Sequence, residues 1–268
     1  MRIVEVEAEA FHVLEYLDAA PRGGTQLREL PFHRARVIGL PPTIDALVIT
    51  SDLQGRARVR SQEGASGLLG EALVEELEAL AELDLVPPLG LCGALLAGDL
   101  YAAPGADKMG ATGDVRAVWR AFAGSMRWVA GVAGNHDLFG KAEEASRFRR
   151  EPGIHLLDGV SVTLDDLRIA GVGGICGRSG KPNRRPPEAF EAAIAGLLPA
   201  RPDVLVLHEG PDDGGRRLGN PRVRALVEGG RSLVVCGHAH WREPLCELAG
   251  GAQVVNVDAR VLVAVAAG

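Results

Sequence analysis

Five apolar stretches of the sequence each end in a polar residue that can bind a metal ion. In chain order these residues are Asp52, Asp99, Asn135, His208 and His238. In open α/β sheets, ligands lie outside the carboxyl ends of the strands, so several strand ends can place their side chains around one site. We therefore predict that these five positions converge, and their convergence is more informative than any single motif.

Two of these positions are followed, two residues later, by a second candidate ligand. Gln54 follows Asp52, and His240 follows His238. In an extended chain, residues i and i+2 project to the same side about 7 Å apart, so a pair can reach one metal ion or two neighbouring ions. Carboxylate, amide oxygen and imidazole together suit Mn²⁺, Fe²⁺ or Mg²⁺. Cysteine is absent from these strand ends, which argues against a structural zinc site.

The segments that must position these residues alternate between strand and helix patterns. Apolar runs predict strands at 45–52, 91–99, 127–137, 203–208 and 232–240. Helical spacing of apolar side chains occurs at 69–80, 115–122, 185–198 and 219–230. Residues 154–174 alternate like two or three antiparallel strands, and 252–266 form a last β-rich tail. The pattern predicts an α/β fold with two stacked mixed β-sheets flanked by helices.

Residues 1–44 are predicted to be an N-terminal extension that packs on a main domain of residues 45–268. Residues 4–10 alternate between apolar and acidic types, which is typical of a strand with one wet face. The pattern from there to about residue 42 is irregular and contains the breakers APRGG and LPP. The first residues lack the features of a signal peptide, and no apolar run is long enough to span a membrane.

Chain length, net charge and cysteine content further limit which classes of protein fit the sequence. With 268 residues the chain can bury a large core, and its net charge of -6 argues against a broad nucleic-acid-binding surface. The cysteines form no Cys-x-x-Cys pair, and we interpret them as buried free thiols in a reducing cytoplasm. They are Cys92, Cys176, Cys236 and Cys246. The chain is therefore predicted to be cytoplasmic; its oligomeric state is left open.

Five motifs, each after an apolar strand, carry a resemblance to a known family. "SDLQG", "AGDLY", "AGNHD", "LHEGP" and "CGHAH" occur in this order between about residues 45 and 260. Their order resembles the Asp-x-His, Gly-Asp, Gly-Asn-His-Asp/Glu, His and Gly-His-x-His pattern of the calcineurin-like metallophosphoesterase superfamily. The resemblance implies a four-layer sandwich with a two-metal centre.

Carried over residue by residue, the resemblance assigns a role to each motif residue. Asp99 bridges both ions. The first metal site is completed by Asp52, Gln54 and His240, and the second by Asn135, His208 and His238. His136 faces the substrate, where it stabilises the transition state or protonates the leaving oxygen. Two divalent ions, Mn²⁺ in preference to Fe²⁺, Mg²⁺ or Zn²⁺, hold a bridging hydroxide that attacks phosphorus.

Two positions depart from the family pattern. Gln54 stands where the family usually has histidine, so we expect a weaker first metal that prefers Mn²⁺ or Mg²⁺. This variant is similar to that of manganese-dependent ADP-ribose/CDP-alcohol diphosphatases. Ala102 stands where protein phosphatases of the superfamily have an aspartate that orients the substrate-facing histidine. The chain therefore resembles the phosphodiesterase and pyrophosphatase branches more closely.

A Gly/Pro-rich loop at Gly177–Glu188 carries four cationic residues that are candidates for contacts with substrate phosphates. They are Arg178, Lys181, Arg184 and Arg185. The alternative interpretation is a solvated surface loop.

These observations predict a binuclear metal-dependent phosphoesterase. It would hydrolyse a phosphodiester or pyrophosphate bond in a small nucleotide-type substrate. Two alternatives remain: a nuclease of the same superfamily, and a catalytically inactive scaffold with this fold. Gln54 is the one feature that favours the scaffold.

Overall fold

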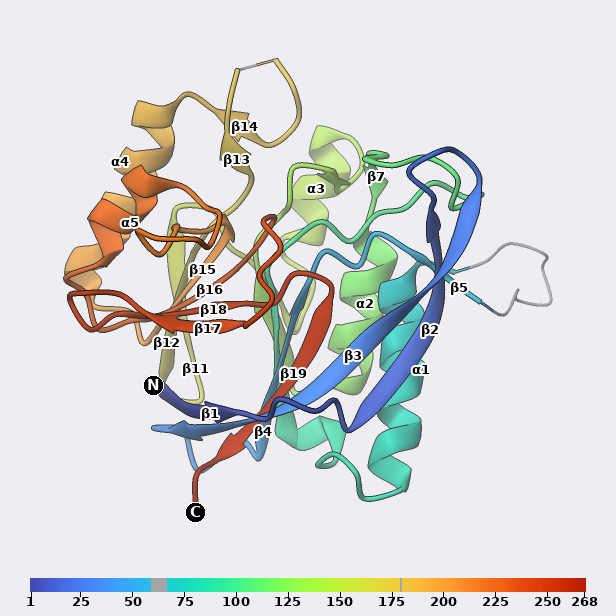
Figure 1. Cartoon of the computed structure of the whole chain (residues 1–268), viewed down its shortest axis with the longest axis horizontal. Coiled ribbons are helices and arrows are strands. Elements are labelled where there is room, and N and C mark those ends of the chain that lie inside the picture. Colours follow the sequence, from blue (N-terminus) through green and yellow to red (C-terminus); the bar gives the residue numbers. More distant parts are fainter. Residues whose placement is uncertain (59–66, 179) are drawn as a thin grey trace.

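Two β-sheets lie face to face, and helices cover the outer side of each (Figure 1). The computed structural model describes residues 1–58, 67–178 and 180–268. Helices α1 (Leu69–Glu82) and α2 (Arg116–Ser125) pack on the first sheet. Helices α4 (Pro187–Leu197) and α5 (Pro221–Val227) pack on the second. This arrangement confirms the predicted α/β fold with two stacked mixed sheets flanked by helices.

The first sheet has nine strands in the described part of the chain. Its order is β10 (Ile154–Leu156), β8 (Trp128–Gly131), β6 (Cys92–Leu96), β4 (Ala46–Ser51), β19 (Arg260–Ala266), β3 (Thr25–Ile38), β2 (His12–Ala19) and β5 (Arg56–Ala57), and β1 (Arg2–Val6) pairs with β3. Strands β4, β6, β8 and β10 are parallel, while β19 is antiparallel to β4. The parallel half carries three of the predicted strand-end residues.

The second sheet has six strands among the described residues. Its order is β11 (Val160–Leu164), β12 (Leu167–Val172), β15 (Val204–Glu209), β16 (Leu233–Gly237), β18 (Gln253–Asn256) and β17 (Leu245–Glu247). The four inner strands are parallel, and an antiparallel strand closes each edge. Smaller elements are β7 (Gly113–Asp114) with β9 (Asp137–Leu138), β13 (Ile175–Cys176) with β14 (Arg184–Arg185), helix α3 (Ala142–Phe148), and the 3₁₀ turns η1 (Leu89–Leu91) and η2 (Leu198–Ala200).

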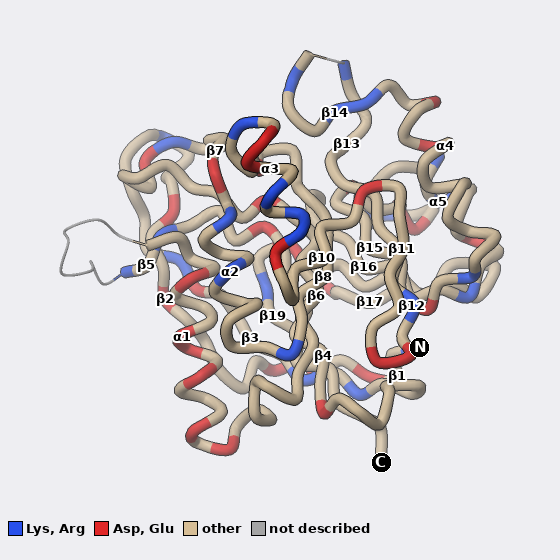
Figure 2. The backbone as a smooth tube through the Cα atoms, turned by 180° about the vertical axis from the view of Figure 1, so that it is seen from behind, with Lys and Arg blue, Asp and Glu red and all other residues tan. Residues whose placement is uncertain are grey.

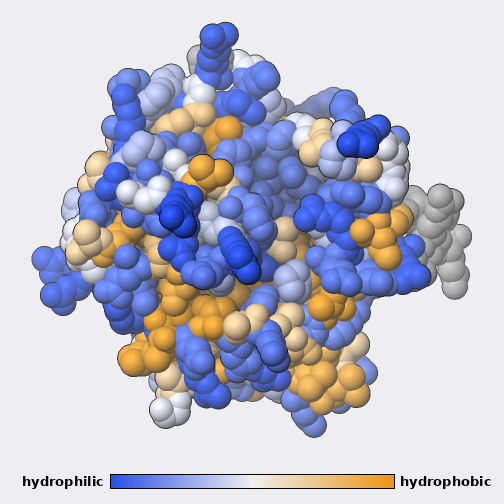
Figure 3. Space-filling model, viewed as in Figure 1, coloured by the Kyte–Doolittle hydropathy of each residue, from blue (hydrophilic) through white to orange (hydrophobic). Residues whose placement is uncertain are grey.

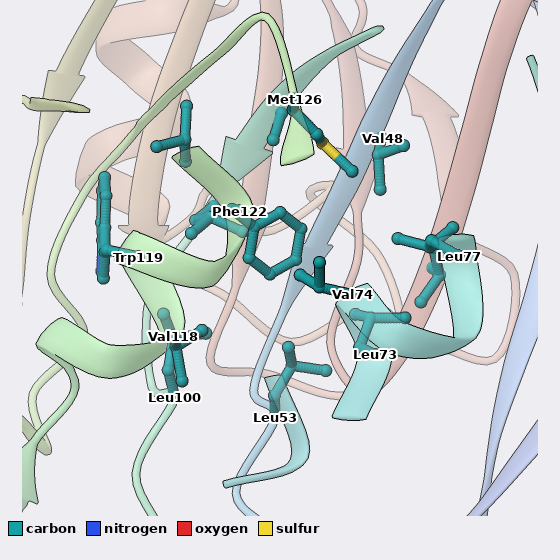
Figure 4. Packing of buried hydrophobic residues seen from close by; sticks show 14 of the residues in the cluster. Val48, Leu53, Leu73, Val74, Leu77, Leu100, Val118, Trp119, Phe122 and Met126 are labelled. Atoms are coloured by element: carbon teal, nitrogen blue, oxygen red, sulfur yellow. The ribbon is translucent and has the colours of Figure 1, made fainter. Parts of the chain in front are cut away.

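Period-two alternation divides each central strand between two apolar layers. In β4, Leu47 and Ile49 enter the layer between the sheets, whereas Val48 enters the layer under the helices. Figure 4 shows Val48 in that layer with Leu77 of α1 and Phe122 of α2. Because both faces are buried, the strand reads as a continuous apolar run, as expected for a covered parallel sheet.

The N-terminal segment is more regular than its sequence suggests. Although the sequence pattern after residue 10 is irregular, β2 and β3 form a long antiparallel hairpin that continues the first sheet. β3 pairs in parallel with β19, at the opposite end of the chain. The backbone N–H and carbonyl of Ile3 also bond to the buried Gln253 amide of the second sheet, each at 2.9 Å. The division between residues 44 and 45 stays a prediction.

The predicted meander also differs in one strand. β11 and β12 form the expected antiparallel pair, whereas β10 leaves it and pairs in parallel with β8 of the other sheet. Local alternation cannot distinguish these outcomes, because it reports burial and not the identity of the neighbouring strand.

The surface shows how charge and hydropathy are distributed. In Figure 2, acidic and basic residues are interspersed over the rear face, with several acidic positions along α1. In Figure 3, apolar residues gather mainly in the lower half of the front face. Among the described residues, no helix is both long and apolar enough to cross a membrane.

We predict that Asp165→Asn lowers the free energy of unfolding by about 1–3 kcal/mol, measured by urea denaturation. Asp165, in the β11–β12 turn, accepts bonds from the Trp128 indole at 2.7 Å and from the Arg127 guanidinium at 2.7 and 2.8 Å. These bonds fasten the second sheet to β8 of the first. Asparagine tolerates the positive φ of 47° at this position, so the substitution removes the charge without new backbone strain.

The matched control is Asp166→Asn, since Asp166 also has a positive φ but is exposed. The Arg127 hydrogen bond lowers the pKa of Asp165. Its contribution is therefore present above the ordinary pKa of about 4 and is lost as the pH falls below it. Equal stabilities of the two variants at neutral pH would contradict the assigned role of Asp165.

Candidate metal centre

The carboxyl ends of five strands from both sheets meet at one edge of the sandwich. Asp52, Asp99 and Asn135 follow β4, β6 and β8, while His208 lies in β15 and His238 follows β16. The ligand atoms of Asp99, His208 and His238 lie within 4.8 Å of one another. Strand β19 is antiparallel to β4, so the C-terminus lies at the opposite edge, which is the lower one in Figure 1.

The carboxylate of Asp99 is the centre of the cluster. Its Oδ1 accepts the backbone N–H of His136 at 2.8 Å. Its Oδ2 lies 3.2 Å from Nε2 of Gln54 and 3.4 Å from Nε2 of His208. Nε2 of His208 is also 3.3 Å from Oδ1 of Asn135. The structure thus links four predicted ligands from four different strand ends directly.

The imidazole of His208 is fully buried and has one fixed orientation. Its Nδ1–H donates to the carbonyl of Ala97 at 2.7 Å, which directs Nε2 toward Asp99. The ring of His238 lies beside it, with centroids 5.1 Å apart. A backbone carbonyl on the remote nitrogen is a common device for fixing the tautomer of a metal-binding histidine.

The backbone is strained at three candidate ligands. Asp52, Asp99 and His238 have φ values of 53°, 56° and 65°, in the left-handed region of backbone conformation that residues other than glycine seldom adopt. This conformation ends each strand and turns its side chain into the site, and such strain typically clusters at functional sites. The loops also approach closely: a Cβ on Gly134 would lie 2.0 Å from Oδ1 of Asp99.

His136 lies next to this cluster without joining it. Its backbone is held by Asp99, and the hydroxyl of Thr112 lies 3.3 Å from its Nδ1. A Cβ added to Gly110 would lie 3.3 Å from its Cε1, so the loop before Thr112 passes close to the ring. The Thr112 hydroxyl and the Gly110 backbone therefore limit where the His136 ring can lie.

Two further residues are candidates for the first metal site: Asp52, which is partly buried, and His240, which is exposed. Oδ2 of Asp52 accepts the Ser51 hydroxyl at 2.7 Å and the backbone N–H of His238 at 3.0 Å. The exposed His240 donates from Nδ1 to Oδ2 of Asp258 at 2.7 Å. Asp52, Gln54 and His240 line one cleft together.

The carboxylates of the cluster carry more negative charge than nearby cationic side chains balance. Within the described ranges, no Lys or Arg pairs with Asp52, Asp99 or Asp137. Burial raises the pKa of Asp52 to about 7, with the charges of Asp258 and Asp99 adding to the rise. Burial and the charge of Asp99 raise the pKa of Asp137 to about 6. Buried carboxylates of this kind are ordinarily paired or bound to metal.

Burial and the same neighbouring charges also shift the pKa values of the histidines. Burial alone would lower the pKa of His208, but the adjacent Asp99 charge raises it. Although burial acts to raise the pKa of Asp99, the positive charge of His208 lowers it. Burial and the charge of His208 lower the pKa of His238 to about 4, which leaves a neutral imidazole. Carboxylate oxygens and imidazole nitrogens crowded together without a Lys or Arg partner fit a divalent cation.

Two carboxylates in the site were not singled out from the sequence. Asp137 accepts the backbone N–H groups of Asp99, Leu100 and Gly134 at 2.7–2.8 Å, and it thereby holds two ligand loops together. Asp258 orients His240. It follows the apolar run 252–257, so the strand-end rule that found the other positions applies to it too. Asp137 is the last residue of the "AGNHD" motif, so the motif contained the position although no role was assigned to it.

The loop at Gly177–Glu188 lies close to the centre through one side chain. Nδ2 of Asn183 donates to the carbonyls of Gly134 and Asp137 at 2.8 and 2.7 Å. Arg185 pairs with Asp158 at 2.6 Å. Ser179 lies outside the described residues. The substrate contacts expected of Arg178, Lys181, Arg184 and Arg185 stay a prediction.

Comparison with known proteins gives distant structural similarity only. No protein-family model matches the chain, and no curated protein sequence matches it. A 5'-nucleotidase precursor from Thermus thermophilus is similar over 80% of this chain at 15% identity and a TM-score of 0.41. The chain spans 48% of that protein's length. A protein of unknown function from Aquifex aeolicus is similar over 81% of this chain and 95% of its own length, at 14% identity and a TM-score of 0.35.

We predict that Asp258→Asn weakens Mn²⁺ binding at the site of His240 by roughly 10–100-fold, measured by calorimetric titration. The carboxylate holds Nδ1–H of His240 and leaves Nε2 free to bind the ion. Asp84→Asn is the control, because Asp84 also has a positive φ and lies exposed after α1. Unchanged Mn²⁺ affinity in Asp258→Asn would show that this pair does not support a ligand.

Proposed function

We propose that the chain is a binuclear metal-dependent phosphoesterase of the calcineurin-like superfamily. It hydrolyses a phosphodiester or pyrophosphate bond in a small nucleotide-type substrate. The observation that carries the proposal is the cluster of Asp99, His208 and His238, with Asp52 and Asp137 adjacent and no Lys or Arg partner for these carboxylates in the described part of the chain. Such a cluster needs a cation, and four of these residues come from four separate strand ends.

The seven proposed ligands divide between two ions around Asp99. Asp52, Gln54 and His240 would hold the first ion, and Asn135, His208 and His238 would hold the second. The amide N–H of Gln54 donates to the Asp99 carboxylate. Binding of an ion by Gln54 therefore requires the amide to turn its oxygen toward the ion. A neutral amide oxygen binds more weakly than imidazole and suits Mn²⁺ or Mg²⁺, and we therefore propose Mn²⁺ as the native ion.

The protein's own residues position and protonate the substrate. When bound, the two ions supply an activated water and neutralise charge on the phosphoryl oxygens. His136 stabilises the charge of the transition state or gives a proton to the leaving oxygen. Its backbone bond to Asp99 and the nearby Thr112 hydroxyl keep its ring beside the ligands. Asp137 maintains the spacing of the Asp99 and Asn135 loops through three backbone N–H groups.

A cytoplasmic location belongs to the same proposal. All four cysteines are free; three are buried, and Cys176 is partly buried. Burial raises the pKa of the Cys92, Cys176 and Cys246 thiols to about 11, which keeps them protonated and unreactive. Unpaired cysteines of this kind are typical of a reducing compartment.

We predict Mn²⁺-dependent hydrolysis of bis-p-nitrophenyl phosphate, with kcat reduced about 10²–10⁴-fold in His136→Ala and Mn²⁺ binding retained. The loss falls on kcat because His136 acts on the leaving oxygen and binds no ion. Release of p-nitrophenol gives the rate, and calorimetry gives the number of ions.

His12→Ala is the control, since His12 lies in β2 and bonds to Glu76 of α1. Binding of two ions without turnover of a panel of ADP-ribose, CDP-alcohols, cyclic nucleotides and single-stranded DNA would favour a scaffold. Turnover of single-stranded DNA alone would favour a nuclease.

The Gln54→His substitution tests the first metal site. Imidazole is the better donor for borderline ions, so the variant should bind its weaker ion more tightly and shift its preference from Mn²⁺ toward Zn²⁺. Paired titrations of wild type and variant with each ion measure both effects. Unchanged affinity and preference would exclude Gln54 as a ligand.

A further inference from the structure

A cleft of about 230 Å³ opens directly beside the proposed first metal. Asp52, Gln54 and His240 are among the residues that line it. A substrate group joined to a phosphoryl group at the metals therefore has this space into which to extend. Pockets that enclose a whole drug-sized ligand are typically ~300–1,000 Å³, so this cleft fits one group of a nucleotide.

Most of the other lining residues come from the β2–β3 hairpin and from loop 101–111. The Thr25 hydroxyl near the hairpin tip donates to the carbonyl of Gly105 at 3.0 Å. Nε of Arg56 in β5 donates to the carbonyl of Ala102 at 3.1 Å. The N-terminal hairpin and the loop are thus bonded together and form one continuous wall.

Tyr16 fixes the position of this wall relative to the metal ligands. The side chain is buried in the first apolar layer, with Tyr16 only 3% exposed. It packs against Gly55, the residue after Gln54, so closely that a Cβ there would lie 2.2 Å from Cδ2 of Tyr16. The hairpin therefore has a defined place beside Gln54.

Two cations line the cleft, one from the hairpin and one from the loop. Arg28 of β3 pairs with Asp18 at 3.1 Å, and half of its side chain remains exposed. A guanidinium has five N–H donors, so this pair leaves others for a ligand. Lys108 of loop 101–111 is exposed, and no ion pair or hydrogen bond within the described chain involves its side chain. Asp258, the remaining acidic wall residue, is already paired with His240.

We propose that Arg28 and Lys108 bind a second anionic group of the substrate, a phosphate joined to the one that is cleaved. The chain then selects diphosphate-linked nucleotides over simple phosphodiesters. This inference rests on the proposed function for the place of the cleaved phosphate. It gives the β2–β3 hairpin, through Arg28, a direct part in substrate recognition in addition to its place in the sheet.

The kinetic test compares two substrates in the Mn²⁺-loaded protein. Arg28→Ala and Lys108→Ala should each raise the KM for ADP-ribose roughly tenfold, the size of one lost charged hydrogen bond. They should leave kcat/KM for bis-p-nitrophenyl phosphate within about twofold, because that substrate has a single phosphate. Arg22→Ala is the control, since Arg22 lies exposed in the turn of the same hairpin and outside the cleft. Equal effects on both substrates, or none on either, would overturn the proposal.

A binding test separates this inference from the proposed function. Calorimetry in Mn²⁺ buffer compares methylenediphosphonate with methylphosphonate, neither of which has a P–O–P bond to hydrolyse. Wild type should bind the first at least about tenfold more tightly, and Lys108→Ala should remove most of that difference. If wild type turns over no phosphoester but keeps this preference, the proposed function fails and the anion site stands. Equal binding of the two probes, or a preference that survives in both variants, overturns the anion site itself.

Discussion

The buried charge of Asp99 is the constraint on which the site depends. Its carboxylate lies where both sheets end, and it meets His208 of one sheet and the Gln54 and His136 loops of the other. Because a buried carboxylate needs compensation, Asp99 accepts the Gln54 amide and the His136 N–H, lies beside the His208 ring, and favours a bound cation. Asp137 adds no compensating charge, but it accepts the backbone N–H groups of Asp99 and Gly134 and so holds both loops in place. The strand ends that meet here therefore share one local charge as well as one place in the sheets.

The N-terminal hairpin extends the site beyond its metal ligands. β3 pairs with the last strand, β19, and β2 places Tyr16 against Gly55. A segment that completes the sheet thus also forms a wall of the cleft beside Gln54. Stability and recognition are coupled here, because the packing that fixes the hairpin also positions Arg28. Lys108 also lines the cleft but is exposed, so a change at Lys108 should affect recognition without affecting the stability of the core.

Much of the fold was predictable because the central strands are covered on both faces. Continuous apolar runs such as 45–52 follow from that burial, and each was recognisable by its length and its polar end. The strands of residues 12–38 were not predicted, because they lie toward the edge of the sheet and alternate with many charged residues. The pairing of β10 with the first sheet was not predicted either, because a local pattern does not specify the partner of a strand.

The sequence by itself determined which chemical groups are available and that strands carry them: Asp52, Asp99, Asn135, His208 and His238 each end an apolar run. Only the tertiary structure decided how they are grouped, because distances between strand ends depend on sheet order and on the stacking of two sheets. It also decided that Asp258 supports His240 and that Arg28 and Lys108 face one cleft. These pairs are far apart in the chain, and long-range packing alone brings them together.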